Sequence, residues 1–279
     1  MTHPLVLSLF PGIGLLDRAF EEEGFCVVRG PDVLWGGDVR RFHPPAHRFD
    51  GVIGGPPCQA FSRLVHIVRA KGQRVAENMI PEYERVVAAA SPAWFLMENV
   101  VDAPEPAVPG FHVRSVVLNN RWFGAEQNRE RRFSFGCITR PIRLDVAPSL
   151  SVFQHPSYEH AVVATSSKEG ALAKSQQELA RGTSPRLAAM AKRRTLPGQQ
   201  PRRSIERCAE LQGLPADFLA DAPFTAAGKY LVIGNGVPLP MGRAVARAVR
   251  QAMGYDLETS LESGRTDPAV VANAGGTTG

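Results

Sequence analysis

The stretch "PLVLSLFPGIGLLDRAFEEEG" (residues 4–24) decides the fold class. Its first part, "PLVLSLF", is short and apolar, which is typical of a strand that is buried on both faces. The turn "PGIG" follows, and apolar residues then recur at helical spacing until Gly24 ends the helix. This order of strand, glycine-rich turn and helix predicts a unit of a parallel α/β sheet.

Further short apolar runs extend this pattern along the chain. We predict strands at 25–29, 49–55 and 93–99, with "MIPEYERVVAAA" (79–90) as an intervening helix, and two more strands at 112–123 and 131–140 that could form a hairpin. The sequence therefore predicts an α/β fold with a mixed, mostly parallel sheet. In such sheets ligands bind at the carboxyl ends of the strands, so the polar strand ends should gather at one edge.

The hydrophobic pattern of the sequence changes along the chain and predicts a division into domains. After residue 141 the periodicity weakens and turn-forming residues accumulate, which predicts a small loop-rich domain. At 229–253 the hydrophobic pattern becomes regular again and predicts a short strand, a Gly/Pro turn and a helix. We expect a large domain at 1–145, a small domain at 146–228, a return to the large domain at 229–255 and a mobile tail at 256–279.

Composition and cysteine usage narrow the class of protein. The four cysteines, at positions 26, 58, 137 and 208, are widely separated and form no CxxC pair, so we expect neither a disulfide framework nor a metal site. We find no signal peptide and no run long enough to span a membrane, and we expect a cytoplasmic protein. A net charge of +5 permits a polyanionic partner, and 181–207 holds eight Lys or Arg residues against the single acid Glu206.

The segment "GGPPCQAFS" (54–62) places one of these cysteines directly after two prolines. Proline fixes φ and removes a backbone donor, so Pro56 and Pro57 hold the backbone stiffly. The glycines before them allow close approach of another group. This arrangement favours presentation of the Cys58 thiol over its burial.

Six motifs occur in order: "LFPGIG", "GGPPCQAFS", "MENV", "QNRERR", "ERCAELQGLP" and "IGNGVPLP". The ordered set resembles the S-adenosylmethionine-dependent cytosine C5 methyltransferases of DNA, of bacterial or phage type. The resemblance runs from about residue 5 to 253, and the gap at 141–200 falls where that family keeps its variable target recognition domain. It implies a Rossmann-like catalytic and cofactor-binding domain and a small target recognition domain, which the predicted parts of the chain match.

The resemblance implies a catalytic set of Cys58, Glu98, Arg129 and Arg131. Cytosine C5 is a poor nucleophile, and the family first adds a cysteine thiolate to C6, which activates C5. Glu98 would be the acid beside N3, a role that suits a carboxyl group with a raised pKa. Arg129 and Arg131 alternate on a strand-like segment, and the family uses such arginines near the cytosine O2 and the glutamate.

The cofactor that the resemblance implies is S-adenosyl-L-methionine. Phe10 would stack on it, the glycine-rich turn and helix N-terminus would let the backbone approach, and no GK[ST] sequence supports a phosphate loop instead. The family's ribose-binding acid is replaced here by Pro31, so we assign Asp32 to the ribose, Asp38 to the adenine amino group and Trp35 to a wall of the adenine pocket. The full predicted set comprises Phe10, Gly12, Ile13, Gly14, Asp32, Asp38, Val39, Pro57, Asn235 and Val237.

A duplex hides the target base, so the enzyme would have to flip it into a pocket. The basic segment 62–78 is either a loop that closes on DNA or a plain amphipathic helix, and the basic residues of 181–207 suit phosphate contacts. In "ERCAELQGLP" the usual Arg-Glu order is reversed. It stays open whether Glu206 or Glu210 acts as a brace, and whether Arg203 or Arg207 contacts phosphate.

Three hypotheses follow from the resemblance. The first is a monomeric methyltransferase of double-stranded DNA in a bacterial or phage-infected cytoplasm, either an orphan or paired with a cognate restriction endonuclease. The second is the tRNA-methylating branch, which usually continues P-C-Q with F-T, whereas Ser62 follows Phe61 here and favours DNA. The third is a catalytically silent paralogue, which would tend to lose Cys58 or Glu98.

Overall fold

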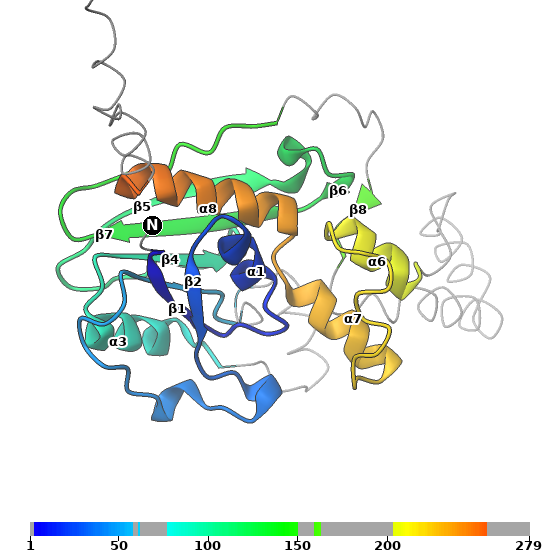
Figure 1. Cartoon of the computed structure of the whole chain (residues 1–279), viewed down its shortest axis with the longest axis horizontal. Coiled ribbons are helices and arrows are strands. Elements are labelled where there is room, and N and C mark those ends of the chain that lie inside the picture. Colours follow the sequence, from blue (N-terminus) through cyan, green and yellow to red (C-terminus); the bar gives the residue numbers. More distant parts are fainter. Residues whose placement is uncertain (1–2, 58–60, 62–76, 150–158, 163–202, 256–279) are drawn as a thin grey trace, which may run out of the picture.

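The computed structural model describes residues 3–57, 61, 77–149, 159–162 and 203–255. These residues form a six-stranded sheet in the order β2-β1-β3-β4-β7-β5, a two-stranded sheet of β6 and β8, and helices packed around them (Figure 1). The strands are β1 (Leu5–Leu9), β2 (Cys26–Arg29), β3 (Gly51–Gly54), β4 (Trp94–Asn99), β5 (His112–Asn119), β6 (Gln127–Asn128), β7 (Glu130–Cys137) and β8 (Glu159–His160). The α-helices are α1 (Leu15–Glu22), α3 (Ile80–Ala90), α6 (Ile205–Leu211), α7 (Ala226–Asn235) and α8 (Leu239–Met253), and the 3₁₀ helices are η1 (Val33–Trp35), η2 (Val39–Arg41) and η3 (Asn120–Phe123).

The strand directions confirm the predicted fold class. Strand β1 pairs in parallel with β2 and β3, and β3 pairs in parallel with β4. Strand β7 runs antiparallel to both β4 and β5, so the two strands expected at 112–123 and 131–140 do form an antiparallel pair. The sheet is therefore mixed: the first four strands in its order are all parallel, and only the pairings of β7 are antiparallel.

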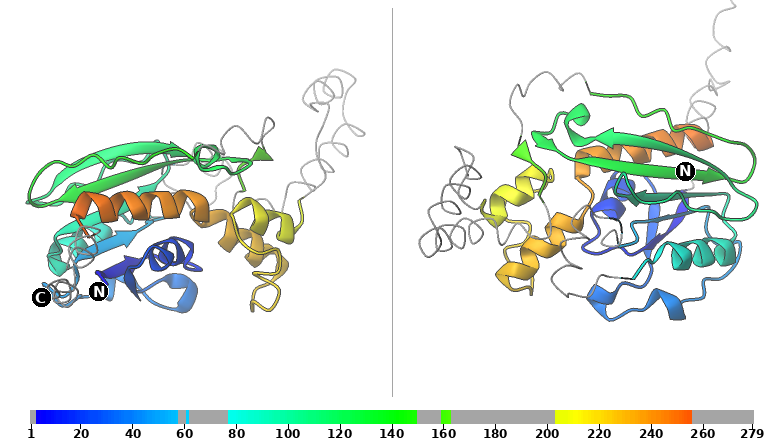
Figure 2. Two further views of the ribbon diagram at one scale, coloured as in Figure 1. Left: turned by 45° about the horizontal axis from the view of Figure 1, so that its top comes forward. Right: turned by 180° about the vertical axis from the view of Figure 1, so that it is seen from behind.

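Both faces of the sheet are covered by helices. Successive residues of a strand point to opposite faces, and the two hydrophobic clusters follow this alternation. Val6 and Leu96 pack with residues of α1 and α8, whereas Leu7 and Phe95 pack with residues of α3. Figure 2 shows α8 running along the sheet. Burial on both faces explains why these strands are continuous apolar runs in the sequence.

Helices α6 and α7 lie beyond one end of the sheet (Figures 1 and 2). Their buried residues share a third cluster with Leu15 and Ala19 of α1. The predicted domain boundary at residue 228 falls inside α7, and the predicted loop-rich region and tail lie largely in 150–158, 163–202 and 256–279, outside the described residues. The division into domains stays a prediction. No helix in the described part of the chain combines the length and the hydropathy needed to cross a membrane.

One predicted element is wrong. The segment from Lys229 to Gly234 was expected to be a short strand, but it belongs to helix α7. The Thr225 hydroxyl caps this helix by accepting a hydrogen bond from the backbone N–H of Gly228. Tyr230 and Ile233, three residues apart, are both buried against the α6 region. The cap and this packing outweigh the preference of Val and Ile for strands. The helix predicted after the turn is confirmed as α8.

The close packing of β4 and β7 gives a stability prediction. Gly136 pairs with Phe95 across these strands, and a Cβ atom at Gly136 would lie 2.2 Å from the Phe95 ring. We expect Gly136→Ala to lower the free energy of unfolding by about 1–3 kcal/mol, because the aromatic ring has to move within a filled core. Urea unfolding followed by tryptophan fluorescence measures this change. An unchanged midpoint would mean that the ring relaxes without cost.

Candidate active site

The carboxyl ends of three neighbouring strands meet at one edge of the sheet. Leu9 of β1 lies beside Gly54 of β3, and Gly54 lies beside Met97 of β4. The residues that follow each strand are therefore brought together. The side-chain amide of Asn99 donates a hydrogen bond of 3.2 Å to the carbonyl oxygen of Pro56, which ties the double-proline segment to the end of β4.

A cavity of about 400 Å³ lies at this edge. Its walls come from the glycine-rich turn, the start of α1, the η1 segment, the ends of β3 and β4, and the end of α7. Of the predicted site residues, the cavity is lined by Phe10, Gly12, Ile13, Asp32, Pro57, Glu98, Arg131, Asn235 and Val237. The structure thus brings together residues that are far apart in the sequence. Cys58 lies outside the described residues.

The glycine-rich turn has an unusual backbone. Gly12 and Gly14 have positive φ angles of 56° and 78°, and Phe10 has a φ of 55°, which is strained for a residue with a side chain. Gly14 does not line the cavity. Its N–H bonds to the carbonyl of Pro11, and a Cβ atom there would lie 2.8 Å from the Arg29 guanidinium. Gly14 therefore shapes the turn that leads into α1.

Asp32 lies at the cavity wall beside this turn. Its carboxylate accepts hydrogen bonds from the backbone N–H groups of Gly12 (2.8 Å) and Leu34 (2.7 Å). A carboxylate has about four acceptor sites, so Asp32 retains capacity for hydroxyl donors of a ligand. The Trp35 indole donates to the carbonyl of Gly12 (2.8 Å), but Trp35 is not among the lining residues and its ring packs beside Phe224.

Asp38 and Val39 are not among the residues that line the cavity. Asp38 caps η2 and pairs with Arg40 at 2.9 Å, and the hydrogen bond from Arg40 holds the pKa of Asp38 below its usual value. Val39 is buried in the cluster that packs around α3. The structure therefore does not bring the residue predicted to contact adenine to the cavity, because η2 turns Asp38 toward its own helix.

Glu98 and Arg131 form an ion pair at the cavity. The Nε atom of Arg131, on β7, lies 2.8 Å from Oε1 of Glu98, on β4. Burial raises the pKa of Glu98, while the positive charges of Arg131 and then Arg129 act in the opposite direction. Gly55 leaves room for the carboxyl group, since a Cβ atom there would lie 3.0 Å from Oε2. The arrangement can hold a carboxylic acid that gives up a proton and then stabilise its anion.

Arg129 does not lie at the cavity beside the Glu98–Arg131 ion pair. Strand β6 ends at Asn128 and β7 begins at Glu130, so the alternation expected for a continuous strand is broken at Arg129. Its side chain is buried, and its guanidinium donates to the carbonyl oxygens of Val162, Gly234 and Gly236. Arg129 is not among the residues that line the cavity.

A buried acid at the cavity, Asp17, was not among the predicted site residues. Asp17 is fully buried in α1 and accepts hydrogen bonds from the Ser8 hydroxyl (2.5 Å) and the Arg29 guanidinium (3.0 Å). Burial raises its pKa, and these two donors act against that rise. The available signal was an acid directly beside Leu15 and Leu16, on the side of the helix that has to be buried. The apolar lining residues Leu231 and Val232 were missed because α7 was expected to be a strand.

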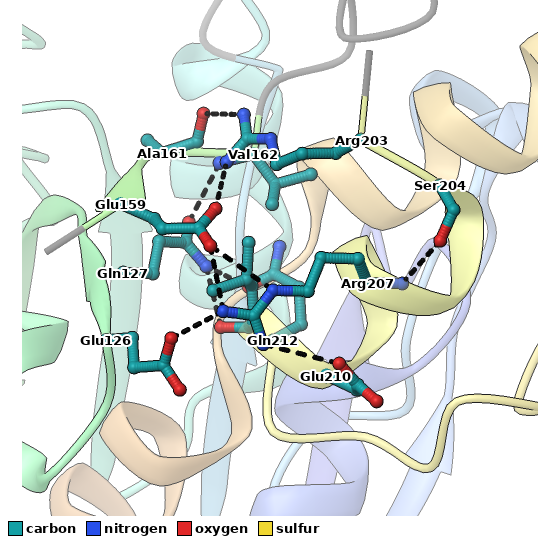
Figure 3. A network of polar contacts seen from close by, with 11 residues as sticks. Glu126, Gln127, Glu159, Ala161, Val162, Arg203, Ser204, Arg207, Glu210 and Gln212 are labelled. Carbon is teal, nitrogen blue, oxygen red and sulfur yellow. Dashed lines mark hydrogen bonds and ion pairs between the residues drawn. The ribbon is translucent and has the colours of Figure 1, made fainter. Parts of the chain in front are cut away.

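An arginine network lies where α6 meets the two-stranded sheet (Figure 3). The Arg207 guanidinium pairs with Glu159 at 2.8 Å, with Glu210 at 3.3 Å and with Glu126, and this raises its pKa. Arg203 lies 3.5 Å from Glu159. Glu206 takes no part in these contacts, and its pKa is lowered chiefly by its own backbone N–H. Of Glu206 and Glu210, only Glu210 contacts Arg207, which Glu126 and Glu159 also contact, and Glu159 contacts both arginines.

The fold and the position of the cavity indicate the class of protein. A largely parallel α/β sheet with a glycine-rich turn and a cavity at its strand ends is typical of proteins that bind a small ligand at that edge. Residues 36–106 match the family model of the C-5 cytosine-specific DNA methylases. This part of the chain is therefore similar to that family, as the motifs predicted. No group of three His, Cys, Asp or Glu side chains in the described part of the chain could hold a metal ion.

The chain is also similar to individual methyltransferases. The chain is 30% identical to the type II methyltransferase M.NgoPII of Neisseria gonorrhoeae over 165 residues, and it spans about half of that relative's length, since the match covers 47% of each chain. It is 24% identical to the type II methyltransferase M.MthTI of Methanothermobacter thermautotrophicus, covering 92% of this chain and 98% of the relative. The solved structure of the Entamoeba histolytica methyltransferase EhMeth covers 91% of this chain with a TM-score of 0.56 at 12% identity, which shows a shared fold.

Proposed function

We propose that this protein transfers a methyl group from S-adenosyl-L-methionine to C5 of cytosine in double-stranded DNA, through a covalent adduct between Cys58 and C6 of a flipped base. The observation that carries the proposal is the Glu98–Arg131 ion pair at a cavity whose wall includes Pro57, the residue directly before Cys58. The family match supports the same activity. We also propose a cytoplasmic enzyme that acts as a monomer, either alone or beside a cognate restriction endonuclease.

The lining residues fit the proposed cofactor. The strained turn at Phe10 and Gly12 forms a cradle, and Asp32 holds that turn through the N–H of Gly12. Apolar residues such as Ile13 and Val232 suit an uncharged ring, while Asp32 suits hydroxyl groups. When bound, S-adenosyl-L-methionine would supply an electrophilic methyl group. In this proposal Phe10, Asp32, Asn235 and Val237 bind and orient it.

The chain's own residues would carry the chemistry on the base. The Cys58 thiolate attacks C6, forming an S–C bond and pushing electron density toward N3. The Glu98 carboxylic acid donates its proton to N3, and the Arg131 guanidinium then stabilises the Glu98 anion and can donate to the cytosine O2. After C5 is methylated, its proton leaves to a base, the S–C bond breaks and Cys58 is released as a thiolate, while the N3 proton returns to Glu98.

Methylome sequencing of DNA from cells that express the protein tests this proposal directly. A method that resolves 5-methylcytosine should find it at a short recurring sequence, and only in cells that express an intact Cys58. Bisulfite sequencing of tRNA from the same cells tests the tRNA alternative. Methylation of tRNA alone would replace the proposed substrate, and modification of neither nucleic acid would favour a silent paralogue.

Asp32→Asn tests the proposed cofactor contact. Asn keeps the size of the side chain but loses the negative charge, and hydrogen bonds to charged groups are stronger than neutral ones. We expect the Kd for S-adenosylhomocysteine, measured by isothermal titration calorimetry, to rise about tenfold.

Asp38→Asn is the matched control for this experiment. Asp38 lies outside the cavity lining and bonds to Arg40, so we expect its Kd to change less than about twofold. If Asp38→Asn weakened binding as much as Asp32→Asn, the assignment of Asp38 to the adenine amino group would regain support. Equal affinity of Asp32→Asn and the wild type would remove Asp32 from the binding set.

A further inference from the structure

Helix α7 ends without the left-handed glycine that often closes a helix. It ends at Asn235, and Gly236 has an extended backbone with φ −69° and ψ 155°. The last carbonyl groups of a helix have no partners within the helix and need donors from elsewhere. Here Gln212 Nε2 donates to the carbonyl of Ile233 (2.6 Å), and Arg129 Nη2 donates to the carbonyls of Gly234 (2.9 Å) and Gly236 (3.0 Å). Two side chains from distant segments thus close this helix.

The backbone that Arg129 holds is a wall of the cavity. Gly234, Asn235, Gly236 and Val237 all line it. On the opposite side, Gly236 packs against Leu15, where an added Cβ atom would lie 2.5 Å from Leu15 Cδ1. Leu15 is the first residue of α1 and follows the glycine-rich turn. The wall is therefore fixed between the Arg129 guanidinium and the helix that begins at the cofactor turn.

Arg129 is well placed to fix this wall rigidly. Its side chain is only 1% exposed, and its Nη1 donates to the carbonyl of Val162 (2.6 Å). The Gln127 amide oxygen accepts from the N–H of Val162 at 3.0 Å (Figure 3). Val162 is therefore held by the side chains of both Gln127 and Arg129. A cation at the C-terminal end of a helix also interacts favourably with the helix dipole. These bonds orient the guanidinium from two directions.

We infer that Arg129 is a positioning residue that holds the Gly234–Val237 wall of the cofactor cavity, and that it does not contact the cytosine. This inference rests on the proposed function, because it concerns the binding of S-adenosyl-L-methionine. It separates the roles of two arginines that stand two residues apart in the sequence. Arg131 pairs with Glu98, the proposed acid that acts on the base, whereas Arg129 holds the end of α7, which forms part of the cofactor cavity.

Arg129→Lys tests the inference. Lysine keeps the positive charge near Glu98 but loses the planar fork that reaches several carbonyl groups at once. We expect the Kd for S-adenosylhomocysteine and the KM for S-adenosyl-L-methionine to rise at least about tenfold, with kcat at saturating cofactor within about twofold of wild type. Arg132→Lys is the matched control, because Arg132 donates to the carbonyl of Ala103, away from the cavity lining, and should leave all three values unchanged.

A second readout follows the wall itself. Hydrogen exchange of the full-length protein without ligands should be faster at residues 234–237 in Arg129→Lys than in wild type, with unchanged exchange in the strands of the large sheet. If Arg129→Lys cannot be obtained folded, Gln212→Asn withdraws the other donor to the same helix end and should give the same selective loss of cofactor affinity.

The possible outcomes separate the two proposals. A lower kcat with unchanged Kd and KM would overturn the inference and return Arg129 to the base. Unchanged Kd and exchange in both Arg129→Lys and Gln212→Asn would also overturn it. Wild-type protein that does not bind S-adenosylhomocysteine at all would instead contradict the proposed function, while the exchange experiment would still test whether Arg129 holds the wall.

Discussion

Cys58→Ser should abolish methyl transfer while DNA binding persists. A serine hydroxyl is far less acidic than a thiol and a weaker nucleophile, so addition to cytosine C6 should slow by several orders of magnitude. The substitution changes one atom and leaves the two prolines before it in place. Transfer of a tritiated methyl group to plasmid DNA measures the activity, and a gel-shift assay measures binding.

Cys26→Ser is the matched control, because Cys26 is an exposed cysteine on β2. It should retain both activity and binding. Methyl transfer by Cys58→Ser at a rate near that of the wild type would exclude the covalent mechanism. Loss of DNA binding together with activity would show instead that Cys58 has a structural role.

Glu98→Gln should lower kcat by a factor on the order of 10²–10⁴, the usual contribution of a positioned general acid. Glutamine is nearly isosteric and can still donate a hydrogen bond, but it cannot transfer a proton to N3. Single-turnover methylation with saturating DNA and cofactor measures the chemical step. Glu130→Gln is the control, since Glu130 is exposed on the neighbouring strand and should keep wild-type activity.

The pH dependence of kcat gives a second test of Glu98. Burial raises the pKa of Glu98, so its protonated, proton-donating form persists to a higher pH than that of an ordinary carboxyl group. Activity that depends on this acid should be complete below the raised pKa and should fall as the pH rises through it. Glu98→Gln should lose this decline. A mild loss of kcat with an unchanged pH profile would show that another group is the acid.

The fold was predictable because three of the parallel strands, β1, β3 and β4, are buried on both faces. Runs such as 4–10 and 93–99 must then be apolar throughout, and short apolar runs between turns and helices give a clear pattern. The segment 229–234 is also a short apolar run that contains Val and Ile, but it is helical. Its state depends on the Thr225 cap and on packing against α6, and packing between distant segments is not visible in a local pattern.

The candidate site was predictable to the extent that it follows from strand ends. Glu98 lies near the end of β4 and Pro57 follows β3, and these strands lie side by side, so their meeting needs only the parallel topology. The role of Arg129 could not be derived in this way, because the break between β6 and β7 removes it from the alternation shared with Arg131. Asp38 failed to reach the cavity for a similar reason, since the short η2 helix directs its side chain to Arg40.

The arginine network bears on how the length of the chain between β8 and α6 can change. Glu159, just before residues 163–202, is bonded to Arg203 and Arg207, just after them, so the two ends of that stretch are joined by side chains outside it. Doubling the length of a connection whose ends are already held costs only about 0.6 kcal/mol. The sequence between residues 163 and 202 can therefore change in length at little cost to the ion pairs that join Glu159 to Arg203 and Arg207.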